Sequence, residues 1–148
     1  MYKHILIPTD GSSTADKAVE AGLAFARESG ARVTLFTAVP EYEMPSEAQM
    51  LARQRIPSIE EHERRSEQKA RDVLAPAEAR ARAAGVVCDS DFKQSNRPYE
   101  AIVAAAGGHG CDAIFMATHA RTGLAKLWHG SETEEVLTHT AIPTLVYR

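Results

Sequence analysis

The sequence predicts an α/β fold, a doubly wound parallel sheet of five strands with four helices. Three observations lead to this prediction. Five short apolar runs have the length of strands, segments with helical spacing of apolar residues separate them, and polar loops follow the first and fourth runs directly. A chain of 148 residues, 44% of them hydrophobic, has the size and composition of one globular unit. We therefore expect a single domain over residues 1–148.

The first part of the chain predicts a strand, a helix and a second strand. Residues His4–Pro8 form a near-continuous apolar run, as in a strand that is covered on both faces. A segment with helical spacing follows, which Ser13 or Thr14 can cap and which Gly30 can end. Residues Arg32–Val39 form a second apolar run. A strand, helix and strand in this order are parallel and right-handed in nearly all proteins.

The middle of the chain contains an insertion. Residues 40–57 lack a clean period, and their three prolines predict a loop with one helical turn around residues 47–53. Ser58 and Glu61 have the spacing of a capping box, which predicts the start of a long charged helix. Residues 86–93 alternate between polar and apolar, which predicts a third strand at an edge of the sheet.

The last part of the chain supplies the remaining elements. A helix is expected to begin at Pro98, because proline suits the first helical position. Residues 112–116 predict the fourth strand, residues 131–140 a helix, and residues 142–147 the fifth strand. Pro143 argues against a central place for the fifth strand, because proline cannot donate a hydrogen bond to a neighbouring strand.

Composition excludes several function classes. A formal net charge of −3 favours neither nucleic acid nor an anionic membrane as a partner. No apolar run approaches the roughly 20 residues that span a bilayer. Cys88 and Cys111 form no Cys-x-x-Cys pair, and the histidines form no metal-binding pattern, so we expect reduced thiols and no metal site. These observations predict a cytoplasmic protein without a membrane or nucleic-acid partner.

Two loops that follow strands have the chemistry of a ligand site. Ligands of doubly wound sheets bind at the carboxyl ends of the strands, where the winding direction reverses. Residues 8–13 follow the first strand, and there Asp10 can accept hydrogen bonds from ribose hydroxyls. Residues 116–133 follow the fourth strand and end at a helix N-terminus, whose free N–H groups can bind phosphate. If the two strands are neighbours, the loops face each other across one crevice.

Several separated motifs resemble the universal stress protein family over the whole chain. They are the start at residues 5–12, the end at residues 142–148, and, between them, His119-x-Arg121-x-Gly123 and Gly130-Ser131. The resemblance implies a Rossmann-like sheet with strand order 3-2-1-4-5. It also implies a homodimer formed through the last strand, residues 142–147, and a subset of members that bind ATP.

The resemblance also implies which residues would surround the nucleotide. Pro8, Thr9 and Asp10 would line the nucleoside side, and Val39 would offer backbone atoms to the adenine. The residues around the ribose and phosphates would be Met116, Ala117, Ala120, Arg121, Gly130, Ser131, Glu132 and Thr133. The implied ligand is ATP, with Mg²⁺ as a candidate companion ion.

The chain departs from the family's Gly-x2-Gly-x9-Gly-[Ser/Thr] signature at two positions. Ala117 and Ala120 stand where the signature has its first two glycines. A positive φ at Ala120 would cost about 1–2 kcal/mol, which weakens a site roughly tenfold. The carboxylate of Glu132 could also repel phosphates. Ser131 and Glu134 have the spacing of a capping box, so local structure alone can explain this serine.

Three functional hypotheses follow. The first is an adenine-nucleotide-binding sensor or switch that acts as a dimer, with at most slow ATP hydrolysis, because no catalytic residues are evident. The second is a branch of the family that does not hold ATP and acts through its dimer surface or through phosphorylation. The third is an enzyme or electron carrier on the same architecture, for example one that binds a flavin nucleotide, and it is disfavoured because few aromatic residues are available near the strand ends.

Overall fold

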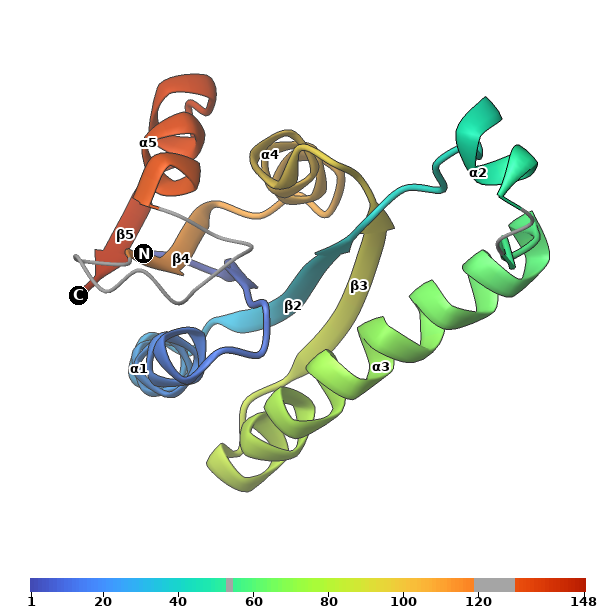
Figure 1. Cartoon of the computed structure of the whole chain (residues 1–148). Helices are drawn as coiled ribbons and strands as arrows, with labels where there is room; N and C mark the ends of the chain where they lie inside the picture. The colour runs from blue at the N-terminus through green and yellow to red at the C-terminus, as the bar shows by residue number, and fades with distance from the viewer. Residues whose placement is uncertain (53–54, 119–129) are drawn as a thin grey trace.

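The computed structural model describes residues 1–52, 55–118 and 130–148, and the side chains of these residues except those of Gly130 and Ser131. Five strands and five helices occur in this part of the chain (Figure 1). In chain order they are β1 (His4–Pro8), α1 (Ser13–Ser29), β2 (Arg32–Val39), α2 (Glu47–Leu51), α3 (Ile59–Ala84), β3 (Cys88–Gln94), α4 (Pro98–Gly108), β4 (Ala113–Ala117), α5 (Gly130–His139) and β5 (Thr144–Tyr147).

The five strands form one sheet with the order β3-β2-β1-β4-β5, and every pair of neighbours is parallel. Helices α1 and α3 cover one face of the sheet, and α4 and α5 cover the other (Figure 1). The predicted doubly wound fold and its strand order are therefore confirmed. The winding direction reverses between β1 and β4.

Successive side chains of each strand point to opposite faces of the sheet, so the core is divided between these two faces. In β1, Ile5 and Ile7 point to the side of α1 and α3, whereas Leu6 points to the side of α4. All five residues of β1 are buried, because this strand has neighbours on both edges and helices on both faces. The near-continuous apolar run in the sequence reflects this position.

The start of α1 corrects one prediction. Ser12 caps the helix, rather than Ser13 or Thr14, and its hydroxyl accepts a hydrogen bond from the Ala15 N–H at 3.2 Å. A capping residue needs extended backbone angles, which Ser12 has, whereas Ser13 is already helical. The predicted C-terminal role of Gly30 is confirmed by its left-handed conformation, with φ 70°.

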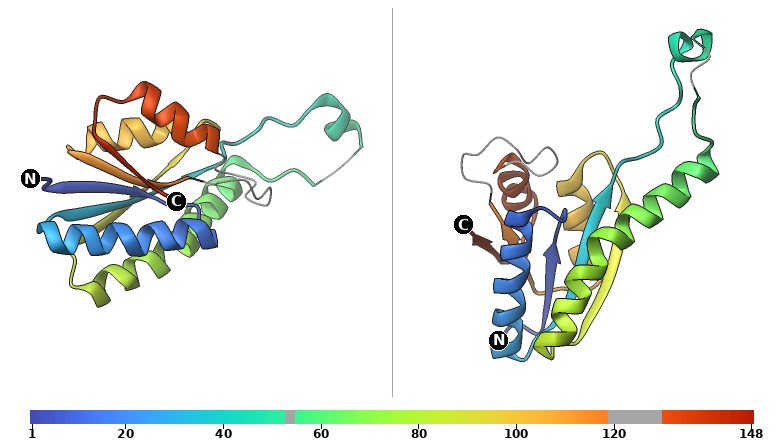
Figure 2. Two further views of the ribbon diagram at one scale, coloured as in Figure 1. Left: turned by 90° about the vertical axis from the view of Figure 1, so that its left-hand side faces the viewer. Right: turned by 60° about the horizontal axis from the view of Figure 1, so that its bottom comes forward.

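The insertion between β2 and α3 extends away from the sheet and carries the short helix α2 (Figure 2). A helical turn was expected here, at residues 47–53, and the structure has it at Glu47–Leu51. Ser58 caps α3 as predicted, through a hydrogen bond from the Glu61 N–H at 3.1 Å. The Glu61 carboxylate pairs with Arg55 at 3.9 Å, so only half of the expected capping box forms.

Both edges of the sheet are occupied as predicted, although the edge strands are shorter than expected. β3 begins at Cys88 and not at residue 86, and β5 begins at Thr144 and not at residue 142. Pro143 lies just before β5, and its carbonyl accepts the Ile114 N–H at 2.9 Å. Proline can accept but not donate, which explains why the strand begins after it. Among the described helices, none is long and apolar enough to cross a membrane.

Candidate functional site

The loop after β1 is held in place by its own polar groups. The Thr9 N–H donates to the Phe36 carbonyl at 2.8 Å, and the Thr9 hydroxyl accepts the Gly11 N–H at 3.2 Å. Asp10 Oδ1 accepts the Ser12 N–H at 2.9 Å, which forms an Asx turn. Gly11 has φ 79°, a conformation that side chains resist. The loop therefore holds the half-buried Asp10 carboxylate at the carboxyl edge of the sheet.

The start of α5 is fixed to the end of β4. The Thr133 hydroxyl donates to the Ala117 carbonyl at 3.0 Å, and the Thr133 side chain is buried. Met116, the residue before Ala117, is also buried. This contact brings the first turn of α5 against the carboxyl end of β4. The free N–H groups of a helix start are thus placed at the sheet edge where ligands of doubly wound folds bind.

Glu132 has a structural partner that the sequence did not reveal. Its Oε2 accepts the Tyr99 N–H at 2.9 Å, at the first turn of α4. Arg97, which precedes α4, provides no side-chain cap, so Glu132 fulfils this role from a distant part of the chain. Because position 97 has no Ser, Thr, Asp or Asn, the sequence could have indicated that α4 needs a cap from elsewhere in the chain. The Glu132 carboxylate is therefore held at the first turn of α4.

Val39 ends β2 at the same edge of the sheet. Its side chain is buried, and its carbonyl accepts the Ser95 N–H at 2.8 Å. A carbonyl oxygen has two lone pairs, so one remains for another donor.

The structure brings most of the predicted site residues to one edge. Pro8, Thr9 and Asp10 follow β1, Val39 ends β2, and Met116 and Ala117 end β4. These three strands are neighbours and parallel, so their carboxyl ends lie together, with Glu132 and Thr133 in the adjoining first turn of α5. Ala120, Arg121 and the side chains of Gly130 and Ser131 lie outside the described part of the chain.

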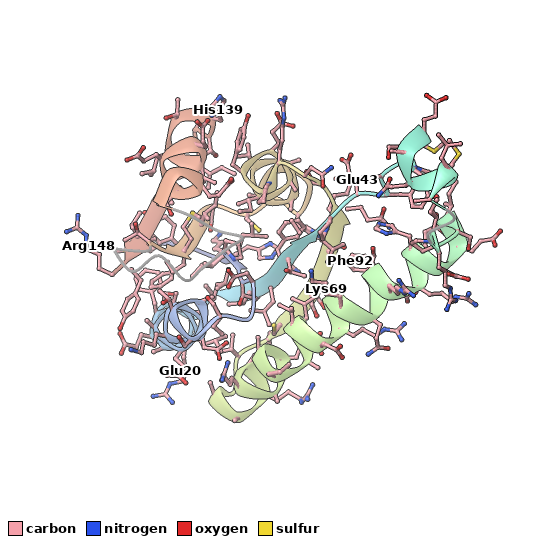
Figure 3. The ribbon with its side chains drawn as sticks, viewed as in Figure 1. Glu20, Glu43, Lys69, Phe92, His139 and Arg148 are labelled. Carbon is pink, nitrogen blue, oxygen red and sulfur yellow. The ribbon has the colours of Figure 1, made fainter. Side chains whose placement is uncertain are left out.

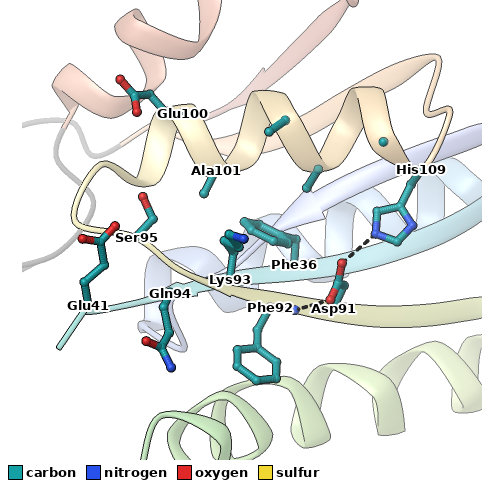
Figure 4. Close-up of a pocket in the computed structure, with 13 residues that line it drawn as sticks. Phe36, Glu41, Asp91, Phe92, Lys93, Gln94, Ser95, Glu100, Ala101 and His109 are labelled. Atoms are coloured by element: carbon teal, nitrogen blue, oxygen red, sulfur yellow. Dashed lines mark hydrogen bonds and ion pairs between the residues drawn. The ribbon is translucent and has the colours of Figure 1, made fainter. Parts of the chain in front are cut away.

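A separate pocket of about 530 Å³ lies between α4 and β3 (Figure 4). Phe36 and Ala101 contribute apolar surface, and Lys93 lies near its middle. At one end His109 Nε2 pairs with Asp91 Oδ2 at 2.8 Å. None of the predicted site residues lines this pocket. It results from the edge position of β3, where α4 leaves part of the sheet uncovered.

His4 lies at the opposite end of the sheet from the candidate site. Its Nε2 is 2.7 Å from the Thr34 hydroxyl, and its Nδ1 is 3.2 Å from Nη2 of Arg32. Because a guanidinium can only donate, Nδ1 is the acceptor and Nε2 carries the proton. Burial and, secondarily, the Arg32 charge lower the pKa of His4, so the neutral ring is favoured. This histidine is part of the core framework.

The cysteines and other metal-binding side chains do not gather into a site in the part of the chain that the structure describes. No group of three or more His, Cys, Asp or Glu side chains could hold a metal ion there. Cys88 and Cys111 are free, and burial raises the pKa of each thiol to about 11. Both thiols are therefore protonated at neutral pH and are poor nucleophiles.

The fold and its edge define a class of protein. A doubly wound parallel sheet, with a turn-held carboxylate after β1 and a helix start at the end of β4, belongs to the Rossmann-like α/β domains that receive ligands at strand ends. Within this class, the chain belongs to the universal stress protein family, whose sequence pattern it matches over residues 1–148.

Individual relatives agree with this assignment. The chain is 32% identical to a universal stress protein of Thermus aquaticus, over the full length of both proteins. It is 29% identical to universal stress protein MJ0577 of Methanocaldococcus jannaschii, over 100% of this chain and 96% of that protein. A solved structure of MJ0577 superposes with a TM-score of 0.75 at 27% identity and covers 99% of this chain and 95% of its own.

Other solved members of the family contain nucleotides. One universal stress protein was solved in complex with cAMP, and it shares 21% identity with this chain at a TM-score of 0.70, over 99% of this chain and 97% of its own. The Archaeoglobus fulgidus protein was solved in complex with dAMP, and it shares 17% identity at a TM-score of 0.68, over 99% of this chain and 98% of its own. At these identities the likeness shows a common fold.

Proposed function

We propose that this universal stress protein binds an adenine nucleotide, with ATP as the ligand, and acts as a dimeric sensor or switch in a stress response. The observation that carries the proposal is the contact of Thr133 with Ala117, which places the start of α5 beside the end of β4. The cAMP and dAMP complexes of other members support nucleotide binding as a property of this fold.

Each part of the nucleotide would meet a different strand end. Oδ1 of Asp10 accepts a hydrogen bond within its own turn. The second carboxylate oxygen, Oδ2, would accept a hydrogen bond from a ribose hydroxyl. The backbone of Val39 would contact the adenine. The N–H groups of residues 130–133 would bind the phosphates, since the first N–H groups of a helix have no internal partners. We expect Ala120 and Arg121 to complete the phosphate side, with Mg²⁺ as a candidate companion ion.

The two alanines set the strength of this site. Ala117 is the last residue of β4, and an extended backbone accommodates its methyl group without strain. Ala120 remains the position at which the missing glycine would matter. The second hypothesis, a branch of the family that does not hold ATP, therefore depends on that one methyl group.

Calorimetric titration of ATP tests the proposal. We expect the natural protein to bind ATP, Asp10→Ala to weaken binding at least tenfold, and Ala120→Gly to strengthen it about tenfold. Asp89→Ala, on the distant edge strand β3, is the matched control and should leave binding unchanged. Heat observed only with Ala120→Gly would favour the second hypothesis, and no heat with either protein at millimolar ATP would refute nucleotide binding. Repeating the titration with EDTA measures the contribution of Mg²⁺.

We also propose a homodimer formed through residues 142–147. β5 is an edge strand with β4 as its neighbour, and no other strand of the described residues pairs with its outer edge, which can therefore pair with a second copy. Val146 is exposed on this strand. Sedimentation of Val146→Asp should show weaker association than the natural protein, and unchanged sedimentation would exclude this interface. The neutral, free thiols support the proposal of a cytoplasmic protein.

A further inference from the structure

An arm leaves the body of the protein after β2, and we define it as residues 40–52 and 55–59. It extends beyond the sheet, carries α2 at its far end and returns into α3 (Figures 1 and 2). Its base is held by specific contacts. The Tyr42 hydroxyl donates to the Pro57 carbonyl at 3.1 Å, His62 Nε2 lies 3.1 Å from the Pro40 carbonyl, and the rings of Tyr42 and His62 are in edge contact at 5.4 Å.

The arm exposes large apolar side chains along its length. Met44, Met50, Leu51 and Ile59 each expose between 55% and 79% of their surface. Helix α2 has five residues, and none of them is buried. Ser46 and Gln49 form a complete capping box, but a helix this short is not stable from capping and propensity alone. Among the described residues, the apolar side chains of α2 therefore have no packing partner of the kind that normally stabilises such a helix.

The outgoing limb of the arm is acidic, and a hollow where the arm joins α3 is lined mainly by arginines. Residues 41–52 contain three glutamates and no lysine or arginine, and Glu43 extends from the outgoing limb (Figure 3). On the returning side, a shallow hollow of about 480 Å³ is lined by Arg55, Arg64 and Arg65 together with Glu61. The acidic limb and the exposed apolar side chains thus belong to the arm, and the basic hollow lies where the arm joins α3.

We propose that the arm is an interface with a second copy of this chain. In a two-fold symmetric contact the same surface of both copies meets, so each residue type must find its complement on the same surface. The arm meets this condition, because the acidic limb of one copy can face the basic hollow of the other while Met50 and Leu51 pack near the axis. The charges set the register and the apolar side chains supply the burial.

Partners other than a second copy would be complementary to only part of the arm surface. An anionic membrane would attract the arginines and accept the methionines, but it would be repelled by the glutamates of residues 41–52. An acidic peptide would occupy the hollow and leave Met50 and Leu51 exposed. The interface is also separate from β5, so a protein that uses both assembles β5 dimers into larger oligomers, and each interface can be measured independently.

Sedimentation velocity tests the proposal in a background that removes β5 pairing. In Val146→Asp protein, we expect the arm to maintain a dimer and Leu51→Glu to increase its dissociation constant at least tenfold. This substitution should leave the fold intact, as judged by circular dichroism, because α2 contains no buried residue. Val87→Glu is the matched control, since Val87 is 73% exposed, close to the 79% of Leu51, but lies outside the arm. Association that Leu51→Glu leaves unchanged would overturn the proposal.

Cross-linking tests the register. We expect a mixture of Glu47→Cys and Arg64→Cys proteins to form mixed disulfide dimers on air oxidation, whereas Glu47→Cys with Glu28→Cys, on the distant helix α1, should form few. Equal yields in both mixtures would contradict the proposed contact. Co-sedimentation of the natural protein with phosphatidylserine vesicles, abolished by Leu51→Glu, would also overturn it in favour of a membrane.

Discussion

At the residue scale, His4 links protonation to folding. Its pKa in the folded protein is below the ordinary histidine value of 6.5, because burial and the Arg32 guanidinium disfavour the charged ring. The charge of His109 also lowers this pKa, whereas the charge of Asp112 and a hydrogen bond with the His109 backbone raise it. As the pH falls below about 6.5, the unfolded chain binds more protons than the folded chain. The free energy of unfolding should therefore decline as the pH falls from about 6.5 towards the lowered pKa of His4.

Urea unfolding between pH 5 and pH 8 measures this effect. The natural protein should lose stability on the acidic side of this range, and His4→Gln should reduce the pH dependence. Asp112 affects stability only at a lower pH than His4 does. Burial acts to raise the pKa of Asp112, but hydrogen bonds from the Lys3 and His4 N–H groups hold it below its usual value. An equal pH dependence in the two proteins would show that His4 is not the titrating group.

Glu132 illustrates a residue whose partner is distant in the sequence. Because its carboxylate caps α4 through the Tyr99 N–H, Glu132→Ala should lower the free energy of unfolding by about 1 kcal/mol. Glu132→Gln keeps an acceptor oxygen and should cost less. We expect the dissociation constant for ATP to change less than about threefold in Glu132→Gln, since the carboxylate is engaged by α4. A much tighter ATP complex would show that the charge does repel phosphates.

At the element scale, Gly22 determines how closely α1 packs on the sheet. A Cβ at this position would lie 2.7 Å from Ile7 Cδ1 and 3.1 Å from the Phe115 ring, and Ile7 is fully buried. Gly22→Ala should therefore destabilise the protein by about 1–3 kcal/mol, although alanine favours helix.

A second helical glycine provides the control for Gly22. Gly107 lies in α4, and a Cβ there would meet nothing within 4 Å. Gly107→Ala should leave stability unchanged or raise it by up to about 1 kcal/mol. Denaturant unfolding of both variants separates packing from helix propensity, and equal effects would contradict the packing argument.

At the scale of the whole molecule, stability should decrease from the centre of the sheet to its edge at β5. All residues of β1 are buried, whereas β5 has four residues, none of them buried. Hydrogen exchange should therefore be slowest in β1 and faster in β5. If β5 pairs with a second copy, its protection should rise with protein concentration while that of β1 stays constant. Uniform protection across the sheet would refute this order.

Local sequence patterns accounted for most elements because the forces behind them are local. The apolar run of His4–Pro8 predicts a fully covered strand, and the isolated Gly30 predicts a helix end. Proline at position 143 correctly placed β5 at an edge. Boundaries were less accurate: Ser12 and Ser13 have the same side chain, and only the backbone angles decide which of them caps α1.

The sequence by itself determined the fold class, the family and the residues expected at the strand ends, because these follow from hydrophobic periodicity and from motifs within a few residues. Only the tertiary structure showed that Glu132 caps α4, that Thr133 fixes α5 to β4, and that no residue of α2 is buried among the described residues. These features depend on contacts between segments that are far apart in the sequence. No local pattern specifies such contacts, because they arise only when the sheet has brought its strands together.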